Sequence, residues 1–329
     1  MTVYRWPVPD PIFRRHPGNP LISADDLPGR WASAFNPGAT LTDDGVVVLV
    51  RGEDRRGLSS IFVARSADGV GGWRIEPRPL LAPDQPWQEW GCEDPRITFV
   101  PETGEYVIAY TAYSHLGPGV GIARTADFHD VHLEGLVLSP ENKDAALFPR
   151  RFEGDWLLVH RPVSGQTGHM WLASSPDLIH WGRPRVLLET RPPVWWDGAR
   201  IGAGTQPLET DAGWLLLYHG VKLAPSGPIY RVGVALLDGE QPWRVLGRSR
   251  EWVFEPEAPY ERTGDVPNVV FPCGAFLRDG EVWMYYGAGD TTVGLATARL
   301  DDVLATLDLS EAPGPGAGAP VPPVTGLPD

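Results

Sequence analysis

The chain has 329 residues, of which 42% are hydrophobic and 10% aromatic, so it can bury a large core and is not a disordered protein. Its formal net charge of −14 argues against nucleic acid and anionic membranes as partners, because both present phosphate groups that require a positive face. The two cysteines, Cys92 and Cys273, are too few for a disulfide scaffold and are typical of a reduced cytoplasm. Residues 1–15 contain no apolar run, so we expect no signal peptide, no membrane span and a cytoplasmic location.

Five apolar strands recur along the chain, each beginning at or just after a glycine. They cover residues 45–51, 104–110, 154–161, 213–219 and 280–286. About 16 to 22 residues after each glycine, a second strand ends in an alanine: Ala64, Ala123, Ala173, Ala235 and Ala296. Successive alanines are about 50 to 62 residues apart, which is closer to the spacing of propeller blades than to that of most helical solenoids.

Short strands rich in valine, leucine and aromatic residues, separated by Gly, Asp and Pro, predict an all-β fold. The five repeats predict a five-bladed β-propeller in a single domain over residues 1–310. Its blades are expected at 30–80, 88–138, 143–190, 196–250 and 266–305, with an outer strand from 13–23 that closes the ring. Residues 311–329 are mostly Pro, Gly and Ala and predict a flexible tail.

Polar residues occupy equivalent positions in these repeats. The first strand of each unit carries 35–39, 93–96, 142–144, 202–207 or 268–274, and the next strand ends at or near Arg51, Tyr110, Arg161, His219 or Asp290. Each residue also has an ordinary structural interpretation: Asp94 as a turn cap, the arginines as solvated surface charges, and His219 as a hydrogen-bonded structural histidine. The shared register across five repeats favours a common site at the centre of the ring.

These segments resemble glycoside hydrolase family 130. The similar motifs, which follow the same order over about residues 30 to 300, are 93–96 (EDPR), 147–149 (LFP), 160–162 (HRP), 202–207 (GAGTQP), 218–221 (YHGV), 270–272 (VFP) and 285–290 (YYGAGD). The resemblance implies a five-bladed propeller and a glycosyltransferase-type phosphorylase. Such an enzyme cleaves β-mannosides with inversion and releases α-mannose 1-phosphate, although some members are hydrolases of β-1,2-mannosides.

The resemblance also assigns roles to individual residues. Asp94 falls on the catalytic acid of the family. The mannose-binding residues fall on Asn36, Arg51 and Asp290, and the phosphate-binding residues on Arg161, His219, Tyr230 and Lys143. Relatives can carry an arginine at the position of Lys143, but a lysine still supplies a point charge for phosphate.

The residue types favour phosphorolysis over hydrolysis. Inverting hydrolysis needs a second carboxylate to activate water, whereas phosphate is already an anionic nucleophile and needs a cationic cradle. We therefore expect inorganic phosphate as co-substrate and no further cofactor, and a pKa of Asp94 raised by burial and by a neighbouring carboxylate such as Glu93. No metal is expected, because His129 and His132 lack a third ligand.

Several alternatives stay open at this point. A β-mannoside hydrolase on the same scaffold, a non-catalytic carbohydrate-binding propeller and an arabinanase- or sucrase-type five-bladed enzyme all fit the repeat count. Trp87, Trp90, Trp195 and Trp196 either stack on an acceptor sugar or pack loops onto the ring. The acceptor (mannose, glucose or N-acetylglucosamine) and the linkage (β-1,4 or β-1,2) are not readable, and the sequence leaves a homo-oligomer open.

Overall fold

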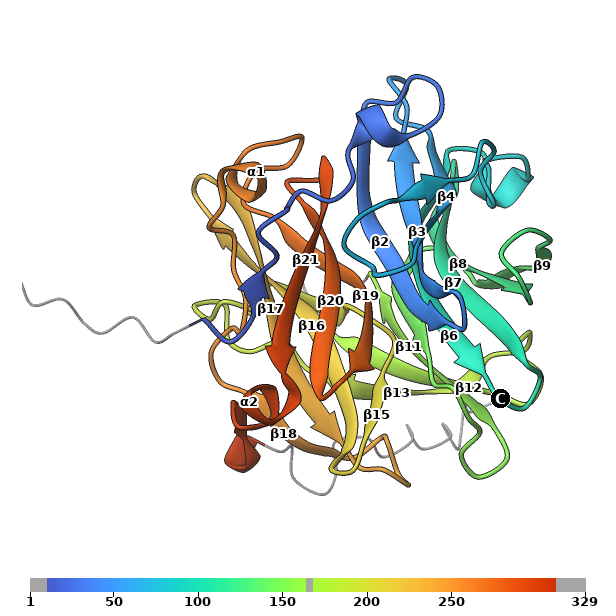
Figure 1. Ribbon diagram of the computed structural model, residues 1–329. Helices are drawn as coiled ribbons and strands as arrows, with labels where there is room; N and C mark the ends of the chain where they lie inside the picture. Colours follow the sequence, from blue (N-terminus) through green and yellow to red (C-terminus); the bar gives the residue numbers. More distant parts are fainter. Residues whose placement is uncertain (1–10, 164–167, 312–329) are drawn as a thin grey trace, which may run out of the picture.

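The computed structural model describes residues 11–163 and 168–311 and is built almost entirely of antiparallel β-sheet (Figure 1). Within this range, α-helix is limited to α1 (Pro259–Arg262) and α2 (Leu300–Leu304). Short 3₁₀ turns are η1 (Ala24–Asp26), η2 (Pro86–Gln88) and η3 (Leu309–Glu311). The predicted all-β class is therefore confirmed. The predicted flexible tail lies outside the described residues, except for Glu311.

The strands form four hydrogen-bonded sheets, which we divide into five sheet units. Unit 1 contains β2 (Ser33–Thr42), β3 (Gly45–Glu53), β4 (Ser59–Ser66) and β5 (Arg74–Ile75), and unit 2 contains β6 (Gly91–Val100), β7 (Glu105–Ser114), β8 (Gly117–Thr125) and β9 (His132–Leu138). Only one parallel pair, Ser59 with Gly91, joins these two units into the eight-stranded sheet. All other ladders between the named strands are antiparallel.

Units 3 to 5 repeat this plan. Unit 3 contains β10 (Asn142–Leu147), β11 (Trp156–Pro162), β12 (Met170–Ser175) and β13 (Gly182–Leu188); unit 4 contains β14 (Arg200–Ala203), β15 (Leu208–Thr210), β16 (Gly213–Ala224), β17 (Gly227–Leu237), β18 (Val245–Ser249) and β22 (Leu307–Asp308); unit 5 contains β19 (Val270–Arg278), β20 (Glu281–Ala288), β21 (Thr292–Arg299) and β1 (Arg14–Arg15). The N-terminal β1 pairs with β21, as expected for the outer strand from residues 13–23.

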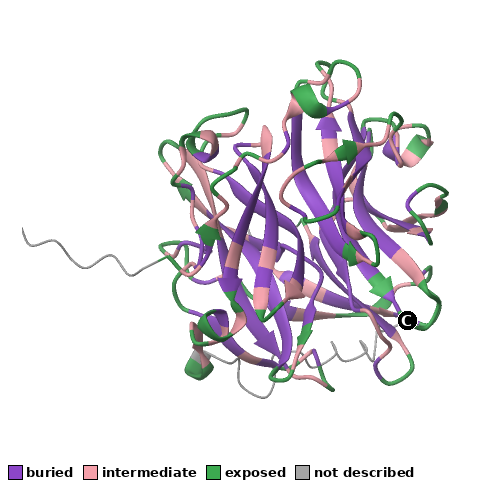
Figure 2. Ribbon diagram, viewed as in Figure 1, coloured by how far each residue is buried: buried purple, intermediate pink, exposed green. Residues whose placement is uncertain are grey.

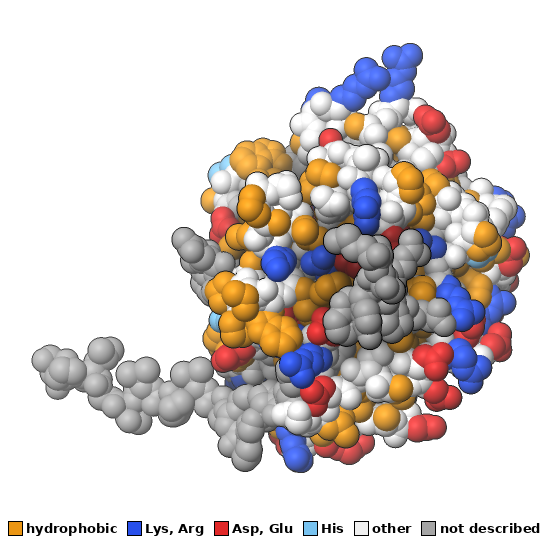
Figure 3. Space-filling view, turned by 90° about the vertical axis from the view of Figure 1, so that its left-hand side faces the viewer, with side chains coloured by type: hydrophobic (Ala, Val, Ile, Leu, Met, Phe, Trp, Pro, Cys, Tyr) orange, Lys and Arg blue, Asp and Glu red, His pale blue; other side chains and the backbone are white. Residues whose placement is uncertain are grey.

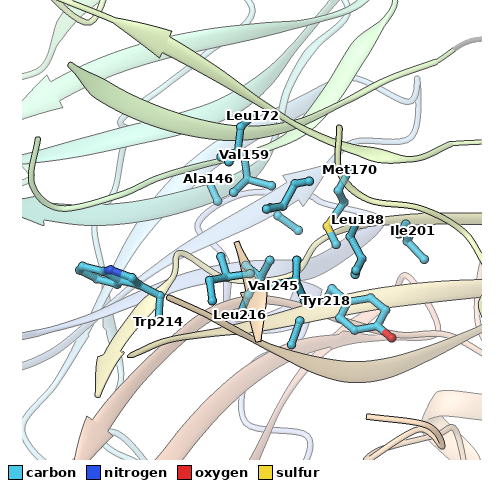
Figure 4. Packing of buried hydrophobic residues seen from close by; sticks show 14 of the residues in the cluster. Ala146, Val159, Met170, Leu172, Leu188, Ile201, Trp214, Leu216, Tyr218 and Val245 are labelled. Carbon is cyan, nitrogen blue, oxygen red and sulfur yellow. The ribbon is translucent and has the colours of Figure 1, made fainter. Parts of the chain in front are cut away.

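The first strands of the units contact one another in sequence: β2 with β6, β6 with β10, β10 with β14, β15 with β19, and β19 with β2. The apolar core follows the same order, because each main cluster of buried residues lies between two neighbouring units. The cluster between units 5 and 1 includes Val46, Val48, Phe276 and Leu295, so the last unit packs on the first. Figure 4 shows the cluster between units 3 and 4, where Val159 and Leu172 face Leu216 and Val245.

This packing explains why the repeated strands are continuous apolar runs. In β3, Val46, Val48 and Val50 point toward unit 5, while Val47 and Leu49 point toward unit 2. Side chains alternate between the faces of a strand, so a strand covered on both faces must be apolar at every position. Figure 2 shows the consequence: strand interiors are buried, and exposure is concentrated in the connecting loops.

On the face seen in Figure 3, Lys and Arg side chains are interspersed with Asp and Glu and with apolar patches. Across the described ranges, no helix has both the length and the apolar character needed to cross a membrane.

Candidate active site

Three first strands carry the same irregularity, a bulge in which two residues oppose one on the neighbouring strand. The bulges contain Asn36 in β2, Asp94 in β6 and Asp144 in β10. These residues have φ values of 46°, 50° and 54°. Asn and Asp tolerate this left-handed conformation better than most residues, and a bulge re-aims the side chains beside it. Equivalent strands therefore present three polar side chains at the same level of the molecule.

The first half of the site is a buried network around Asp94. Asn36 donates from Nδ2 to Asp94 Oδ1 at 2.8 Å, and Arg51 donates from Nη1 to the same oxygen at 3.0 Å. Arg51 Nη2 also reaches Glu53 at 2.8 Å and Glu93 at 3.0 Å. Arg51 is thus shared among three carboxylates, and its guanidinium carbon lies 4.5 Å from the centre of the Phe35 ring.

The expectation of a raised pKa for Asp94 is wrong for the free protein. Burial favours the neutral acid, but Arg51, Lys143, Arg96 and the hydrogen bond from Asn36 outweigh it and hold the pKa of Asp94 below its ordinary value. The pKa of the neighbouring Glu93 moves in the opposite direction. Burial raises the pKa of Glu93, despite the opposing charge of Arg51.

Asp290, in the turn between β20 and β21, has an even more unusual carboxyl group. Burial, followed by the negative charge of Asp94, raises its pKa to about 7. The sites of Asp94 and Asp290 are thus coupled electrostatically, as expected if both line one pocket. Asp290 also has a positive φ of 49°.

The second half of the site is cationic and comes from units 3 and 4. Arg161, at the end of β11, donates from Nε to Asp144 Oδ2 at 2.7 Å. Arg200, at the start of β14, donates from Nη2 to the hydroxyl of Tyr230 at 3.0 Å. The two arginines flank Gly168, since a Cβ atom at this glycine would lie 3.1 Å from Arg161 Cδ and 3.1 Å from Arg200 Cβ. Lys143, on β10 opposite Arg161, contributes to the electrostatics of Glu93, Asp94, Asp144 and Asp290.

His219 belongs to this half but is not a cation, so it adds no charge to the cationic cradle that we expect for phosphate. Burial lowers the pKa of His219 to about 3, although Asp144 opposes the shift. The imidazole packs on the Phe271 ring at a centroid distance of 4.5 Å, and its Nε2 lies 3.4 Å from Asp144 Oδ2. At neutral pH it is therefore an uncharged ring that offers one donor and one acceptor.

Arg96, the last residue of the EDPR motif, serves the fold. Its guanidinium donates to three backbone carbonyl oxygens: Gly204 at 3.0 Å, Ala203 at 3.0 Å and Asp94 at 2.7 Å. The side chain is fully buried. It therefore fastens the bulge that carries Asp94 to unit 4.

The four tryptophans proposed for sugar stacking separate into different environments. Trp196 is buried, stacks on Tyr218 at 5.7 Å and donates to the carbonyl of Arg250, so it packs a loop onto unit 4. Trp195 lies near Arg191 and Arg250, and Trp87 packs against the core between units 1 and 2. Trp90 is 42% exposed and meets Tyr113 edge-on at 5.3 Å. Of the four, Trp90 is the one that is exposed to solvent.

The sequence analysis did not single out Arg200, and it included Asp144 only within the polar segment 142–144, with no role of its own. Arg200 lies two positions before the motif that begins at Gly202, and its place at a strand start beside a glycine-rich turn was the available signal. Asp144 follows Lys143 at the offset that Asp94 has from Glu93, so the repeat itself indicated a third bulge residue. Among the described residues, no cluster of His, Cys, Asp and Glu is arranged to hold a metal ion.

An all-β protein whose neighbouring units bring a buried carboxylate network beside a cationic group has the layout of a carbohydrate-active enzyme that handles an anion. The comparisons agree with this class. The family model described as beta-1,4-mannooligosaccharide phosphorylase matches residues 11–309, and the chain belongs to glycoside hydrolase family 130.

Similar proteins include the beta-1,2-mannobiose phosphorylase of Listeria innocua, which is 37% identical over 254 residues and covers 77% of this chain and 70% of the relative. The beta-1,4-mannooligosaccharide phosphorylase of Ruminococcus albus is 34% identical over 307 residues, covering 89% of this chain and 90% of the relative. A solved structure of beta-1,2-mannobiose phosphorylase from Listeria innocua in complex with beta-1,2-mannobiose superposes with a TM-score of 0.83 at 30% identity, covering 90% of this chain and 99% of that one.

Proposed function

We propose that this protein is an inverting phosphorylase that cleaves a β-D-mannoside with inorganic phosphate and releases α-D-mannose 1-phosphate. The observation that carries the proposal is the division of charge in the site. The carboxyl groups of Glu53, Glu93, Asp94 and Asp290 gather on units 1, 2 and 5, whereas the cations Lys143, Arg161 and Arg200 come from units 3 and 4, and the carboxylate among these cations, Asp144, is itself paired with Arg161. The names of the relatives support the same reaction.

The fold that positions this chemistry is proposed to be a five-bladed β-propeller formed by residues 1–310 as one catalytic domain. Support comes from the five sheet units, from the circular order of contacts among their first strands, and from the apolar cluster between units 5 and 1. In such a ring the first strands surround the axis, so side chains from every blade can converge on one ligand.

In the proposed mechanism, Asn36, Arg51 and Asp290 bind mannose and hold its anomeric carbon between Asp94 and the phosphate. Phosphate oxygen attacks this carbon, the bond to the leaving oxygen breaks, and the leaving oxygen receives the proton of Asp94, directly or through a sugar hydroxyl. The configuration changes from β to α because attack and departure occur on opposite faces. Holding the reactants in this geometry supplies much of the acceleration.

The depressed pKa of Asp94 belongs to the free protein, and substrate binding is proposed to reverse it. Sugar hydroxyls compete for Asn36 and Arg51, which removes groups that favour the carboxylate. The incoming phosphate adds negative charge nearby, which favours the protonated acid. Asp94 thus acquires its proton when both substrates are present, and it is ionised in the empty site.

The phosphate site is proposed to consist of the cations Lys143, Arg161 and Arg200 with Tyr230 and the neutral His219. Arginine offers a planar fork that matches phosphate oxygens, and convergence in a confined, partly desolvated pocket strengthens each contact. No other cofactor enters the mechanism. The neutral His219 can donate one hydrogen bond and accept another from a protonated phosphate oxygen.

The test is to incubate the protein with β-1,2- and β-1,4-mannobiose, with and without inorganic phosphate, and to quantify mannose 1-phosphate and free mannose. We expect mannose 1-phosphate only when phosphate is present. Release of free mannose at the same rate without phosphate would instead identify a β-mannoside hydrolase. A reverse reaction with α-mannose 1-phosphate and mannose, glucose or N-acetylglucosamine identifies the acceptor through phosphate release.

A further inference from the structure

Asp144 is a buried carboxylate among cations. Its side chain is fully buried. Oδ2 accepts the Nε–H of Arg161 at 2.7 Å and lies 3.4 Å from Nε2 of His219, while Oδ1 lies 3.7 Å from Nη2 of Arg96. Two of these three partners are proposed phosphate ligands.

The surroundings of Asp144 leave little room for movement. A Cβ atom on Gly202 would come within contact of both Asp144 Oδ2 and the His219 ring, so this glycine admits the pair by having no side chain. Asp144 itself is held in the left-handed conformation of the β10 bulge. The position of Asp144 is therefore fixed by the backbone of Gly202 and by the backbone of its own bulge.

A buried carboxylate is costly unless its charge is compensated, and its pairing with Arg161 has a geometric consequence. The carboxylate takes the Nε–H and leaves both terminal Nη groups of Arg161 unused. Within the described part of the chain, neither Nη group donates a hydrogen bond to protein. A guanidinium held by Nε presents its remaining donors as a fork, which is the arrangement that binds two oxygens of a phosphate.

We propose that Asp144 is a positioning residue for the phosphate nucleophile, which holds Arg161 by Nε and the His219 ring by Nε2 so that both face the anion in one fixed geometry. The inference rests on the proposed function. It assigns Asp144 a role different from that of Asp94, although the two residues occupy equivalent bulges: one carboxylate serves the sugar and the other serves the anion.

A purely electrostatic role predicts the opposite effect of mutation, and this makes the inference testable. If Asp144 only neutralises charge, Asp144→Asn increases the positive charge of the site and tightens phosphate binding. If it positions Arg161, the same substitution weakens binding, because an amide holds the guanidinium less firmly and with no fixed orientation. We expect phosphate affinity to fall about 10- to 100-fold, the range found when a metal-binding residue loses its outer partner.

The experiment is calorimetric titration of inorganic phosphate into the full-length wild type, Asp144→Asn, Arg161→Lys and the double variant. Arg161→Lys keeps the charge but loses Nε, so we expect a similar loss, and the double variant should lose little more than either single one. Steady-state kinetics should show a raised KM for phosphate with the KM for the mannoside within about threefold, because positioning acts on one substrate.

Asp197→Asn is the matched control. Asp197 is equally buried and accepts hydrogen bonds from Arg191 at 2.9 Å and Arg248 at 2.7 Å, but its partners lie outside the proposed phosphate site. We expect Asp197→Asn to lower the free energy of unfolding without changing the affinity for phosphate.

Unchanged or tighter phosphate binding by Asp144→Asn, or strictly additive losses in the double variant, would overturn the inference while leaving the phosphorylase intact. If Asp144→Asn does not fold, Arg161→Lys still decides the question, because phosphate binding equal to that of the wild type contradicts a requirement for the Nε contact. A wild type that binds no phosphate overturns the proposed function and this inference together.

Discussion

Asn36 and Asp94 occupy the same bulge position in two neighbouring sheet units, and the amide of one donates a 2.8 Å hydrogen bond to the carboxylate of the other. The bond crosses from unit 1 to unit 2, so the proposed acid is held by a neighbouring unit as well as by its own strand. An anionic Asp94 accepts this bond and the one from Arg51 at the same oxygen, Oδ1. In the free protein, these two bonds set the orientation of the carboxylate.

Replacing Asp94 by Asn should reduce phosphorolysis of mannobiose by about 10²- to 10⁴-fold, because the proton donor is lost. The reduction should nearly vanish with 2,4-dinitrophenyl β-mannoside, whose leaving group needs no proton. Phosphate-dependent release of each leaving group measures the difference. An equal loss with both substrates would indicate that Asp94 acts in binding and not as the acid.

Replacing Asp290 by Asn should change how stability depends on pH. The folded-state pKa of about 7 lies above the ordinary value of 3.8, so between these pH values the unfolded chain loses a proton that the folded protein keeps. The wild type therefore loses stability as the pH rises from about 4 to about 7, and Asp290→Asn does not carry this loss. We expect denaturant unfolding to show that the free energy of unfolding of the variant, relative to that of the wild type, is higher at pH 8 than at pH 5.

The exposed Asp279→Asn is the control for this measurement and should follow the wild type at both pH values. If the difference in free energy of unfolding between Asp290→Asn and the wild type is the same at pH 5 and pH 8, the carboxyl group of Asp290 has its ordinary pKa. Mannoside binding by Asp290→Asn should be weakened at both pH values, since the sugar contact is lost.

Replacing Arg200 by Ala should raise the KM for phosphate about 10- to 100-fold, the range expected for losing a hydrogen bond to a charged group. Tyr230→Phe should have a smaller effect, because it removes only the hydroxyl to which Arg200 donates. Arg150→Ala is the control, since Arg150 is partly exposed and pairs with Glu209 and Glu240. Initial rates over a phosphate series provide the values, and an unchanged KM in Arg200→Ala would remove this residue from the phosphate site.

Trp90 and Trp196 should respond differently to replacement by Ala. Trp196→Ala should lower the free energy of unfolding by about 3–5 kcal/mol, because the ring is buried against Tyr218. Trp90→Ala should leave stability nearly unchanged and raise the KM for the disaccharide if its exposed ring stacks on the acceptor. Thermal unfolding and mannobiose kinetics on both variants separate the roles, and an unaltered KM in Trp90→Ala places the acceptor elsewhere.

Much of the fold was predictable because its signal is local. The run at residues 46–50 is apolar throughout, since β3 is covered on both faces, and Gly45 before it has a positive φ that suits the tight turn into the strand. The residues of the site were equally visible as polar exceptions at repeated positions. Arg200 escaped notice because it lies two positions before the motif at residues 202–207, and its place at a strand start is a weak signal in one sequence.

The charge states were not predictable, since they depend on sums over residues that are distant in the chain. Asp94 and Asp290 are both buried acids, yet their pKa values move in opposite directions. The difference arises from Arg51 and Asn36, which contact Asp94 directly, and from Asp94 itself, which repels a second negative charge. His219 is likewise neutral because it is buried, and the residues next to it in the sequence do not predict that burial.

Because of the guanidinium of Arg96, the site depends on a part of the chain that is synthesised well after Asp94. It links the backbone of Asp94 to carbonyl groups 107 and 108 positions further along the chain than Arg96 itself. A nascent or proteolysed fragment that ends before unit 4 already contains the proposed acid and most of the sugar-binding groups, but lacks this anchor. Such a fragment also lacks Arg200, His219 and Asp290, so we expect it to be inactive.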